Sequence, residues 1–260
     1  MDLGLDGKVV MVAAASKGLG YGIAKAVAAE GAKVSICSRD ANAIEEAAKT
    51  IREETGAEVL AMTCDMSDAA DIKNWVGKTA SEWNQIDGLL VNAGGPPAQL
   101  FKETSDEAWQ EAFNLTLMST VRMIREALPH MKNGGSILVT TSASIKEPIP
   151  WLGLSTVMRA GVAGLIKTLA DELAGDNIRV NNLIPGRIDT DRVAALDQNT
   201  ANKMGITFEE ARAQAVAKIP LGRLGNIEEY GKAAAFLLSP TAEYISGATL
   251  RVDGGLMRSI

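Results

Sequence analysis

Ser155 and Arg159 lie in the stretch LSTVMRAG (154–161), which has the composition expected at the start of a helix. Because residues four apart on a helix share one face, the hydroxyl and the guanidinium are expected to project together. Arg159 keeps its charge and offers a fork of N–H donors, whereas the Ser155 hydroxyl can both donate and accept a hydrogen bond. Such a pair can bind a ligand or take part in catalysis, and it can equally be ordinary helix surface.

The elements that would position this pair alternate along the whole chain. Strands are expected at 8–14, 33–38, 58–65, 86–94, 135–142, 178–186 and 248–255. Helices are expected at 20–32, 40–56, 67–84, 105–131, around Ser155 and Arg159 to about 174, in the polar segment 191–218, and at 227–239. Gly31 and Gly56 are predicted to end the first two helices, and Ser67 to cap the third.

Strands separated by helices predict right-handed βαβ units and a parallel sheet covered on both faces. We therefore predict an α/β, doubly wound Rossmann fold with a mostly parallel sheet of about seven strands. No repeat or low-complexity linker interrupts the pattern, so one domain is expected over residues 1–260.

Composition excludes several classes of protein. A net charge of −6 and a pI near 5.0 argue against a nucleic-acid binder. Cys37 and Cys64 stand in apolar runs and are expected to be buried free thiols, as in a reducing cytosol. With His130 as the single histidine, a structural zinc site is not expected. The first residues lack a basic segment and no apolar run reaches a membrane span, so we expect a cytoplasmic protein with no membrane partner and no metal.

Ligands of doubly wound sheets bind beyond the carboxyl ends of the strands. In this sequence those ends are rich in small and polar residues: AAASKGLG (13–20), SRD (38–40), CDMSD (64–68), NAGG (92–95), TTSAS (140–144) and PGRIDT (185–190). In the first, small residues would admit a pyrophosphate, and the following helix would supply N–H groups and a positive dipole. A tight strand-to-helix turn has the same composition.

With these motifs in this order, the whole chain resembles the short-chain dehydrogenase/reductase family, which includes the β-ketoacyl carrier-protein reductases. That family opens with Thr-Gly-x-x-x-Gly-x-Gly; here Gly18 and Gly20 match, while Ala13 and Ala14 replace the first two residues. Because alanine does not readily adopt a positive φ, we expect ordinary backbone angles at Ala14. IPLGRLGNIEE (219–229) and VDGG (252–255) resemble the family's C-terminal segments.

The resemblance implies a dinucleotide site along these loops. Asp65 would hold the adenine amino group, and the segment that includes Ile188 and Thr190 would hold the nicotinamide amide. The cofactor-binding positions implied are Ala14, Ser16, Lys17, Gly18, Leu19, Gly20, Ser38, Arg39, Asp65, Met66, Asn92, Ala93, Gly94, Arg159, Pro185, Gly186, Ile188 and Thr190.

The residues after the second expected strand favour NADP(H) over NAD(H). Ser38 stands where an NAD-specific protein usually has an acidic side chain, which leaves room for a 2′-phosphate. Arg39 and Lys17 are candidates to bind that phosphate, and they are alternatively solvated surface cations. Asp40 is open to two interpretations, as the ligand of the ribose or as the cap of the next helix.

The family resemblance also implies a catalytic tetrad of asparagine, serine, tyrosine and lysine. Asn114 and Ser142 match the first two, and Ser142 lies thirteen residues before position 155, as in the family. The tyrosine and lysine positions hold Ser155 and Arg159. Arg159 is expected to hold the nicotinamide ribose and to favour an alkoxide-like transition state, but not to relay protons. Lys146 is the candidate proton donor, or it pairs with Glu147 or faces solvent.

Two functions remain open. The first is an NADP(H)-dependent oxidoreductase that interconverts a ketone, 3-oxoacyl-like or other, and a secondary alcohol, with an altered tetrad and 191–218 as its substrate loop. The second is an inactive dinucleotide-binding or structural homologue. A weaker idea is a carrier-protein surface made by Arg122, Arg125 and Arg179. The resemblance implies a homotetramer, and Trp151, Leu152 and Leu154 are expected in an apolar pocket wall or in the core.

Overall fold

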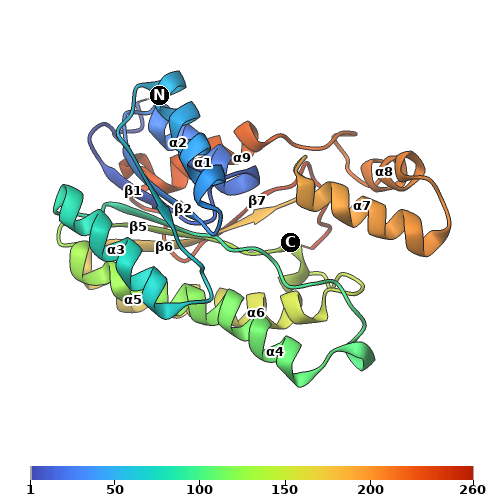
Figure 1. The fold of residues 1–260 in the computed structure, drawn as a ribbon. Coiled ribbons are helices and arrows are strands. Elements are labelled where there is room, and N and C mark those ends of the chain that lie inside the picture. The colour runs from blue at the N-terminus through green and yellow to red at the C-terminus, as the bar shows by residue number, and fades with distance from the viewer. Residues whose placement is uncertain (1, 260) are drawn as a thin grey trace.

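A single parallel sheet organises the computed structural model, which describes residues 2–259. Its seven strands run in the order β3-β2-β1-β4-β5-β6-β7, and each neighbouring pair is parallel (Figure 1). The order reverses between β1 and β4, as in a doubly wound Rossmann fold, so the predicted fold class is confirmed. The strands are β1 Val9–Val12, β2 Lys33–Ser38, β3 Val59–Thr63, β4 Gly88–Val91, β5 Gly135–Thr140, β6 Ile178–Pro185 and β7 Thr249–Val252.

Helices cover both faces of this sheet because its central strands are buried on both sides (Figure 1). Successive residues of β1 face opposite layers: Val10 and Val12 pack in one hydrophobic core and Met11 in the other. The first core includes α1 (Gly18–Ala29), α2 (Ala41–Thr55) and α9 (Ile227–Leu238). The second includes α3 (Ala69–Trp83), α5 (Ser119–Ala127) and α6 (Gly153–Glu172).

Two further helices project from the layers on the side where β6 ends (Figure 1). They are α7 (Asp191–Met204) and α8 (Phe208–Val216), separated by Gly205 in the left-handed conformation at φ 65°. The segment 191–218 was predicted to be polar and helical, and this is confirmed.

The long helix predicted at 105–131 is interrupted. After α4 (Asp106–Ala112), residues Phe113–Met118 form a π turn in which the Ser119 N–H bonds the Asn114 carbonyl five residues back. The chain then continues as α5 and ends in a 3₁₀ turn at Leu128–His130. Apolar periodicity does not reveal this extra residue per turn, and π turns are frequent at functional sites.

Two helix starts also differ from the prediction. The cap of α3 is Asp68, which accepts hydrogen bonds from the N–H groups of Ala70 and Asp71, while Ser67 instead donates to Asp65. Helix α1 begins at Gly18, two residues before the predicted start. At α3, neighbouring cap-forming side chains compete for the same helix end, and the sequence alone does not rank them.

Cys37 and Cys64 are buried free thiols, as predicted. Their Sγ atoms lie 4.0 and 3.9 Å from the sulfur of Met66, and burial raises the pKa of the Cys37 thiol. In the part of the chain described here, we find no helix that is both long and apolar enough to cross a membrane.

Candidate functional site

The loop after β1 has a shape that the sequence did not predict. Ala14 has φ 52°, in the left-handed region, so the expectation of ordinary angles there was wrong. Backbone hydrogen bonds on both sides hold it: the Ala13 N–H donates to the Leu90 carbonyl at 3.2 Å and the Ala15 N–H to the Cys37 carbonyl at 2.9 Å. The neighbouring strands therefore fix the turn and stabilise a conformation that alanine seldom adopts.

This loop leaves the start of α1 open to an anion. Lys17 caps the helix without a side-chain hydrogen bond, and no acidic residue stands in the first turn. A Cβ on Gly20 would lie 2.3 Å from the Ala14 carbonyl oxygen, so only glycine permits this close approach. Free N–H groups, a positive helix dipole and small side chains fit the pyrophosphate of a dinucleotide.

The ends of β2 and β3 carry the charged residues proposed for the adenosine half. Asp65 accepts from the Ser67 N–H and hydroxyl, which together with the nearby Arg39 lower the pKa of its carboxyl. Asp40 caps α2, accepting from the N–H groups of Asn42 and Ala43, so the structure favours the capping role. Arg39 is exposed, and Lys17 pairs with Asp191 at 2.6 Å.

The loops after β4 and β6 are held by close backbone approaches. Asn92 donates its side-chain N–H to the Ala13 carbonyl at 3.4 Å. A Cβ on Gly186 would lie 2.4 Å from the Cα of Asp253, so only glycine permits the PG and VDGG segments to approach this closely. The Asp189 N–H donates to the Gly225 carbonyl, which ties the PGRIDT segment to the 219–229 segment.

The predicted catalytic positions lie on elements that contact one another. Ser155 is buried on α6, and α6 packs against both the π turn that carries Asn114 and the 3₁₀ turn that follows Ser142. The Ser142 hydroxyl accepts a hydrogen bond from the Ser144 N–H at 3.2 Å. Lys146 lies at the other end of that turn and is exposed, which favours the solvent-facing alternative for this side chain.

Arg159 reaches from α6 to the end of β5. Its guanidinium donates to the Thr140 carbonyl at 2.8 Å. Removal from water, together with the charge of nearby Arg192, lowers its pKa to about 10, while Tyr230 has the opposite effect. Arg159 therefore remains charged at neutral pH.

Tyr230 is a second neighbour of the end of β5, and no sequence motif pointed to it. It lies on α9, fully buried, and its hydroxyl contacts the Thr140 hydroxyl at 3.3 Å and the Leu183 carbonyl at 3.1 Å. Burial raises its pKa, so it supports the end of β5 rather than supplying protons. Tyr230 packs in the first core and helix α6 in the second, yet both Tyr230 and Arg159 contact Thr140 at the end of β5, which their chain positions did not indicate.

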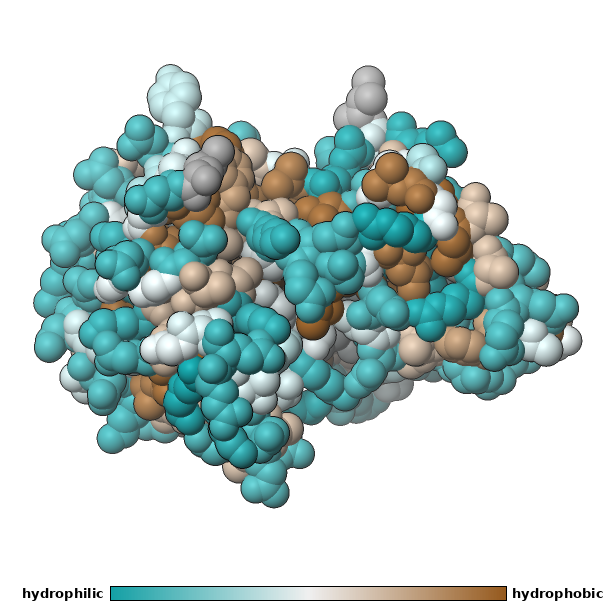
Figure 2. All heavy atoms as spheres, turned by 90° about the horizontal axis from the view of Figure 1, so that it is seen from above, coloured by the Kyte–Doolittle hydropathy of each residue, from teal (hydrophilic) through white to brown (hydrophobic). Residues whose placement is uncertain are grey.

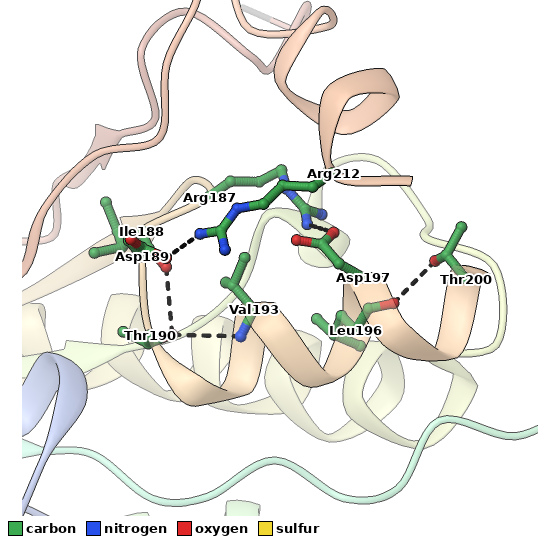
Figure 3. A network of polar contacts seen from close by, with 9 residues as sticks. All are labelled: Arg187, Ile188, Asp189, Thr190, Val193, Leu196, Asp197, Thr200 and Arg212. Atoms are coloured by element: carbon green, nitrogen blue, oxygen red, sulfur yellow. Dashed lines mark hydrogen bonds and ion pairs between the residues drawn. The ribbon is translucent and has the colours of Figure 1, made fainter. Parts of the chain in front are cut away.

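Ion pairs fasten α7 and α8 to the PGRIDT segment (Figure 3). Arg187 pairs with the buried Asp197 of α7, and Arg212 of α8 pairs with Asp189. Thr190 caps α7 through the Val193 N–H. The helices of the expected substrate loop are thus tied to the segment expected to hold the nicotinamide amide.

Other contacts from α7 reach across the site. The Arg192 guanidinium donates to the Pro96 carbonyl at 3.1 Å. The Lys203 ammonium lies 4.1 Å from the ring centre of Trp151, which is exposed rather than part of the core. Seen from above, hydrophobic side chains gather on the side of the molecule that carries α7 and α8, where Met204 and Leu221 are exposed (Figure 2).

The loop that carries Lys146 is also fastened to the C-terminal segment. The carboxylate of Glu147 accepts hydrogen bonds from the N–H groups of Arg258 at 2.9 Å and Ser259 at 2.7 Å, and these hydrogen bonds lower its pKa.

Leu154 is buried in a small cluster with Ala112 and Met158, so it belongs to the core.

Arg179 is not available for a carrier protein. Its guanidinium donates to the carbonyls of Leu237, Ser239 and Ile245 inside the protein.

Two hollows of about 620 and 810 Å³ open near β5 and β6 around Asn133 and Asn177. They lie at the amino ends of these strands, the opposite edge from the predicted site.

Comparison with known proteins shows which family this chain is related to. Residues 13–257 match the family model described as enoyl-(acyl carrier protein) reductase. The chain is 32% identical to the 3-oxoacyl-[acyl-carrier-protein] reductase FabG of Escherichia coli, over 98% of this chain and 99% of that one. It superposes with a TM-score of 0.95 on L-sorbose reductase from Gluconobacter frateurii complexed with NADPH and L-sorbose, at 30% identity over all of both chains. A TM-score of 0.88 and 30% identity relate it to an NADPH-bound short-chain oxidoreductase from Pseudomonas aeruginosa PAO1 that contains an atypical catalytic center, over 98% and 99% of the two chains.

Proposed function

Because the chain belongs to the short-chain dehydrogenase/reductase family, we propose that it is an NADP(H)-dependent oxidoreductase that interconverts a ketone and a secondary alcohol with an altered catalytic tetrad. The observation that carries this proposal is the position of Arg159. A charged guanidinium at the end of β5, on the helix that packs against the elements of Ser142 and Asn114, stands where the family pattern has lysine.

The preference for NADP(H) rests on the loops after β1 and β2. With Asp40 engaged as a helix cap, no carboxylate of that loop is left to hold a ribose 2′-hydroxyl. Arg39 is exposed at the end of β2, and Lys17 is exposed as well, in an ion pair with Asp191. Both cations suit a 2′-phosphate.

The proposed roles follow from the side chains. Bound NADPH would supply a hydride to the carbonyl carbon while the oxygen takes a proton, so that ketone, NADPH and H⁺ yield alcohol and NADP⁺. Arg159 holds the nicotinamide ribose and stabilises negative charge on the oxygen. Ser142, with Ser155 beside it, orients that oxygen. The proton comes from Lys146 or from water, since Ser155 is a very weak acid and Tyr230 is buried.

The alternative is a homologue that binds the dinucleotide without catalysis, which the absence of a tyrosine at position 155 favours. In either case we infer a homotetramer, joined through the long helices and the C-terminal segment as in the family. Light scattering at micromolar concentration would show a monomer if that inference is wrong.

The experiment is a fluorescence titration with NADPH followed by a screen of ketones and alcohols. Arg159→Ala should weaken NADPH binding by about 1–3 kcal/mol, the scale of a lost charge-assisted hydrogen bond. Ser155→Ala should change binding little, and Lys146→Ala should lower kcat more than Ser155→Ala does. Ser155→Tyr combined with Arg159→Lys should raise ketone reduction. If Ser155→Ala alone abolishes turnover, the assigned roles are wrong; NADPH binding without any turnover supports the inactive homologue.

A further inference from the structure

The proposed site carries unpaired positive charge, although the net charge of the whole chain is negative. The net charge of the protein is −6. Yet three cations from two elements stand at this site, Arg159 on α6 with Arg192 and Lys203 on α7. Among the ion pairs formed by residues 2–259, none includes Arg159, Arg192 or Lys203.

The carboxylates of the neighbouring segment are already neutralised. Between residues 185 and 204 the acidic residues are Asp189, Asp191 and Asp197, and each faces a cation (Figure 3 shows the first and the last). Across the site, Glu147 accepts two backbone N–H groups. The positive charge of Arg159 and Arg192 therefore has no balancing partner among these groups.

Arg192 is held in a way that leaves most of its donors free. Its Nη2 donates to a neutral acceptor, the Pro96 carbonyl at 3.1 Å, and would lie 3.2 Å from a Cβ placed on Gly95. A guanidinium has five N–H donors arranged in a fork that matches a carboxylate. The charge of Arg192 also lowers the pKa of Arg159, less than removal from water does, so the two guanidinium groups repel each other. A bound anion would relieve this repulsion.

We propose that the substrate is an oxo acid, and that Arg192, backed by the charge of Arg159, binds its carboxylate. This inference rests on the proposed function. The phosphates of the cofactor are expected at the start of α1, near Lys17, whereas Arg192 donates to the Pro96 carbonyl in the loop after β4. Arg159, whose pKa the charge of Arg192 lowers, donates to the Thr140 carbonyl at the end of β5. The nicotinamide expected there carries no negative charge, so we assign the anion to the substrate, and the test below compares it with a cofactor phosphate. Arg192 is thus a specificity-determining residue.

The test compares acetoacetate with its uncharged counterpart, methyl acetoacetate, by calorimetric titration into the protein saturated with NADP⁺. The unmodified protein should bind acetoacetate about 10- to 100-fold more tightly than the ester, the range of a charge-assisted hydrogen bond. Arg192→Gln should remove that preference and leave the Kd for NADP⁺ within about twofold, because the variant removes no contact proposed for the cofactor. Lys49→Gln, which removes one exposed charge from α2, should retain the preference.

Two outcomes would overturn the inference: equal affinity of the unmodified protein for acid and ester, or a loss of NADP⁺ affinity in Arg192→Gln equal to the loss for acetoacetate, which would assign Arg192 to a cofactor phosphate. Steady-state rates separate this inference from the proposed function. Selective binding of acetoacetate, with no turnover of any ketone or alcohol in the screen, would refute the oxidoreductase and keep the anion site. Turnover of acid and ester with the same kcat/KM would keep the oxidoreductase and refute the anion site.

Discussion

Replacing Ala14 with glycine tests the left-handed turn at the cofactor loop. At φ 52° an L-residue carries a cost of about 1–2 kcal/mol, which glycine avoids. Glycine in turn increases the entropy of the unfolded chain, which costs about 0.4–1 kcal/mol. The Ala14 methyl is only partly buried, so little packing is lost. The net expectation is a stabilisation of about 0.5–1 kcal/mol, or a rise in Tm of about 1–4 °C for a chain of this size.

The assay is thermal unfolding with and without NADPH. Because the backbone already has the shape that a glycine would take, the Kd for NADPH should stay within about twofold. The neighbouring variant Ala15→Gly is the matched control: Ala15 is fully buried and does not have a positive φ, so loss of its methyl and the added chain entropy should destabilise by about 1–2 kcal/mol.

A destabilised Ala14→Gly protein would contradict the left-handed turn, because glycine then has only its entropic cost. A cofactor affinity that rises tenfold or more would contradict it in another way. It would mean that alanine holds the loop away from the shape that binds pyrophosphate.

Three other predictions concern the charged residues. Asp197→Ala should cost about 3–5 kcal/mol in urea unfolding because Arg187 loses its partner, and Arg187→Met with Asp197→Leu should recover much of that loss; equal stability of all three proteins would show that the pair does not hold α7. Since the pKa of Arg159 is about 10, its charge is lost as pH rises toward 10.5. Between pH 8 and 10.5 the unmodified protein should therefore lose about fourfold more NADPH affinity than the Arg159→Gln variant does. Parallel pH profiles would remove Arg159 from the cofactor site. Arg39→Ala should abolish most of the preference for NADPH over NADH, and equal affinities in the unmodified protein would refute the role of Arg39 and Lys17.

The local sequence pattern was sufficient to predict the parallel sheet and the order of strands and helices along the chain. The buried strands read as continuous apolar runs, and Gly56 ended α2 in the left-handed conformation as its position indicated. The local pattern did not predict backbone turns or side-chain contacts that depend on segments distant in the sequence. The turn at Ala14 is imposed by hydrogen bonds to β2 and β4, and Tyr230 reaches Thr140, the residue that Arg159 also contacts, because α9 packs against β5.

The proposed catalytic residues show the same limit. Ser142, Asn114, Ser155 and Arg159 were chosen by resemblance, and the structure places them on packed neighbouring elements. No sequence pattern indicated that Arg192 bonds the loop after β4 and that its charge acts on Arg159, since both depend on how α7 packs. Nor did any pattern indicate that Arg187 and Asp197 pair across ten residues.

The hydrogen bonds of Glu147 to the backbone at 258 and 259 have a consequence for synthesis. The loop that carries Lys146 is made first, and its two N–H partners follow 111 and 112 residues later. As the chain emerges from the ribosome, the hydrogen bonds of the loop after β1 to Cys37 and Leu90 can form early, but the loop around Lys146 must wait for almost the entire polypeptide. A nascent chain stalled before residue 258 would therefore have a formed turn after β1 and a loop around Lys146 that is not yet anchored.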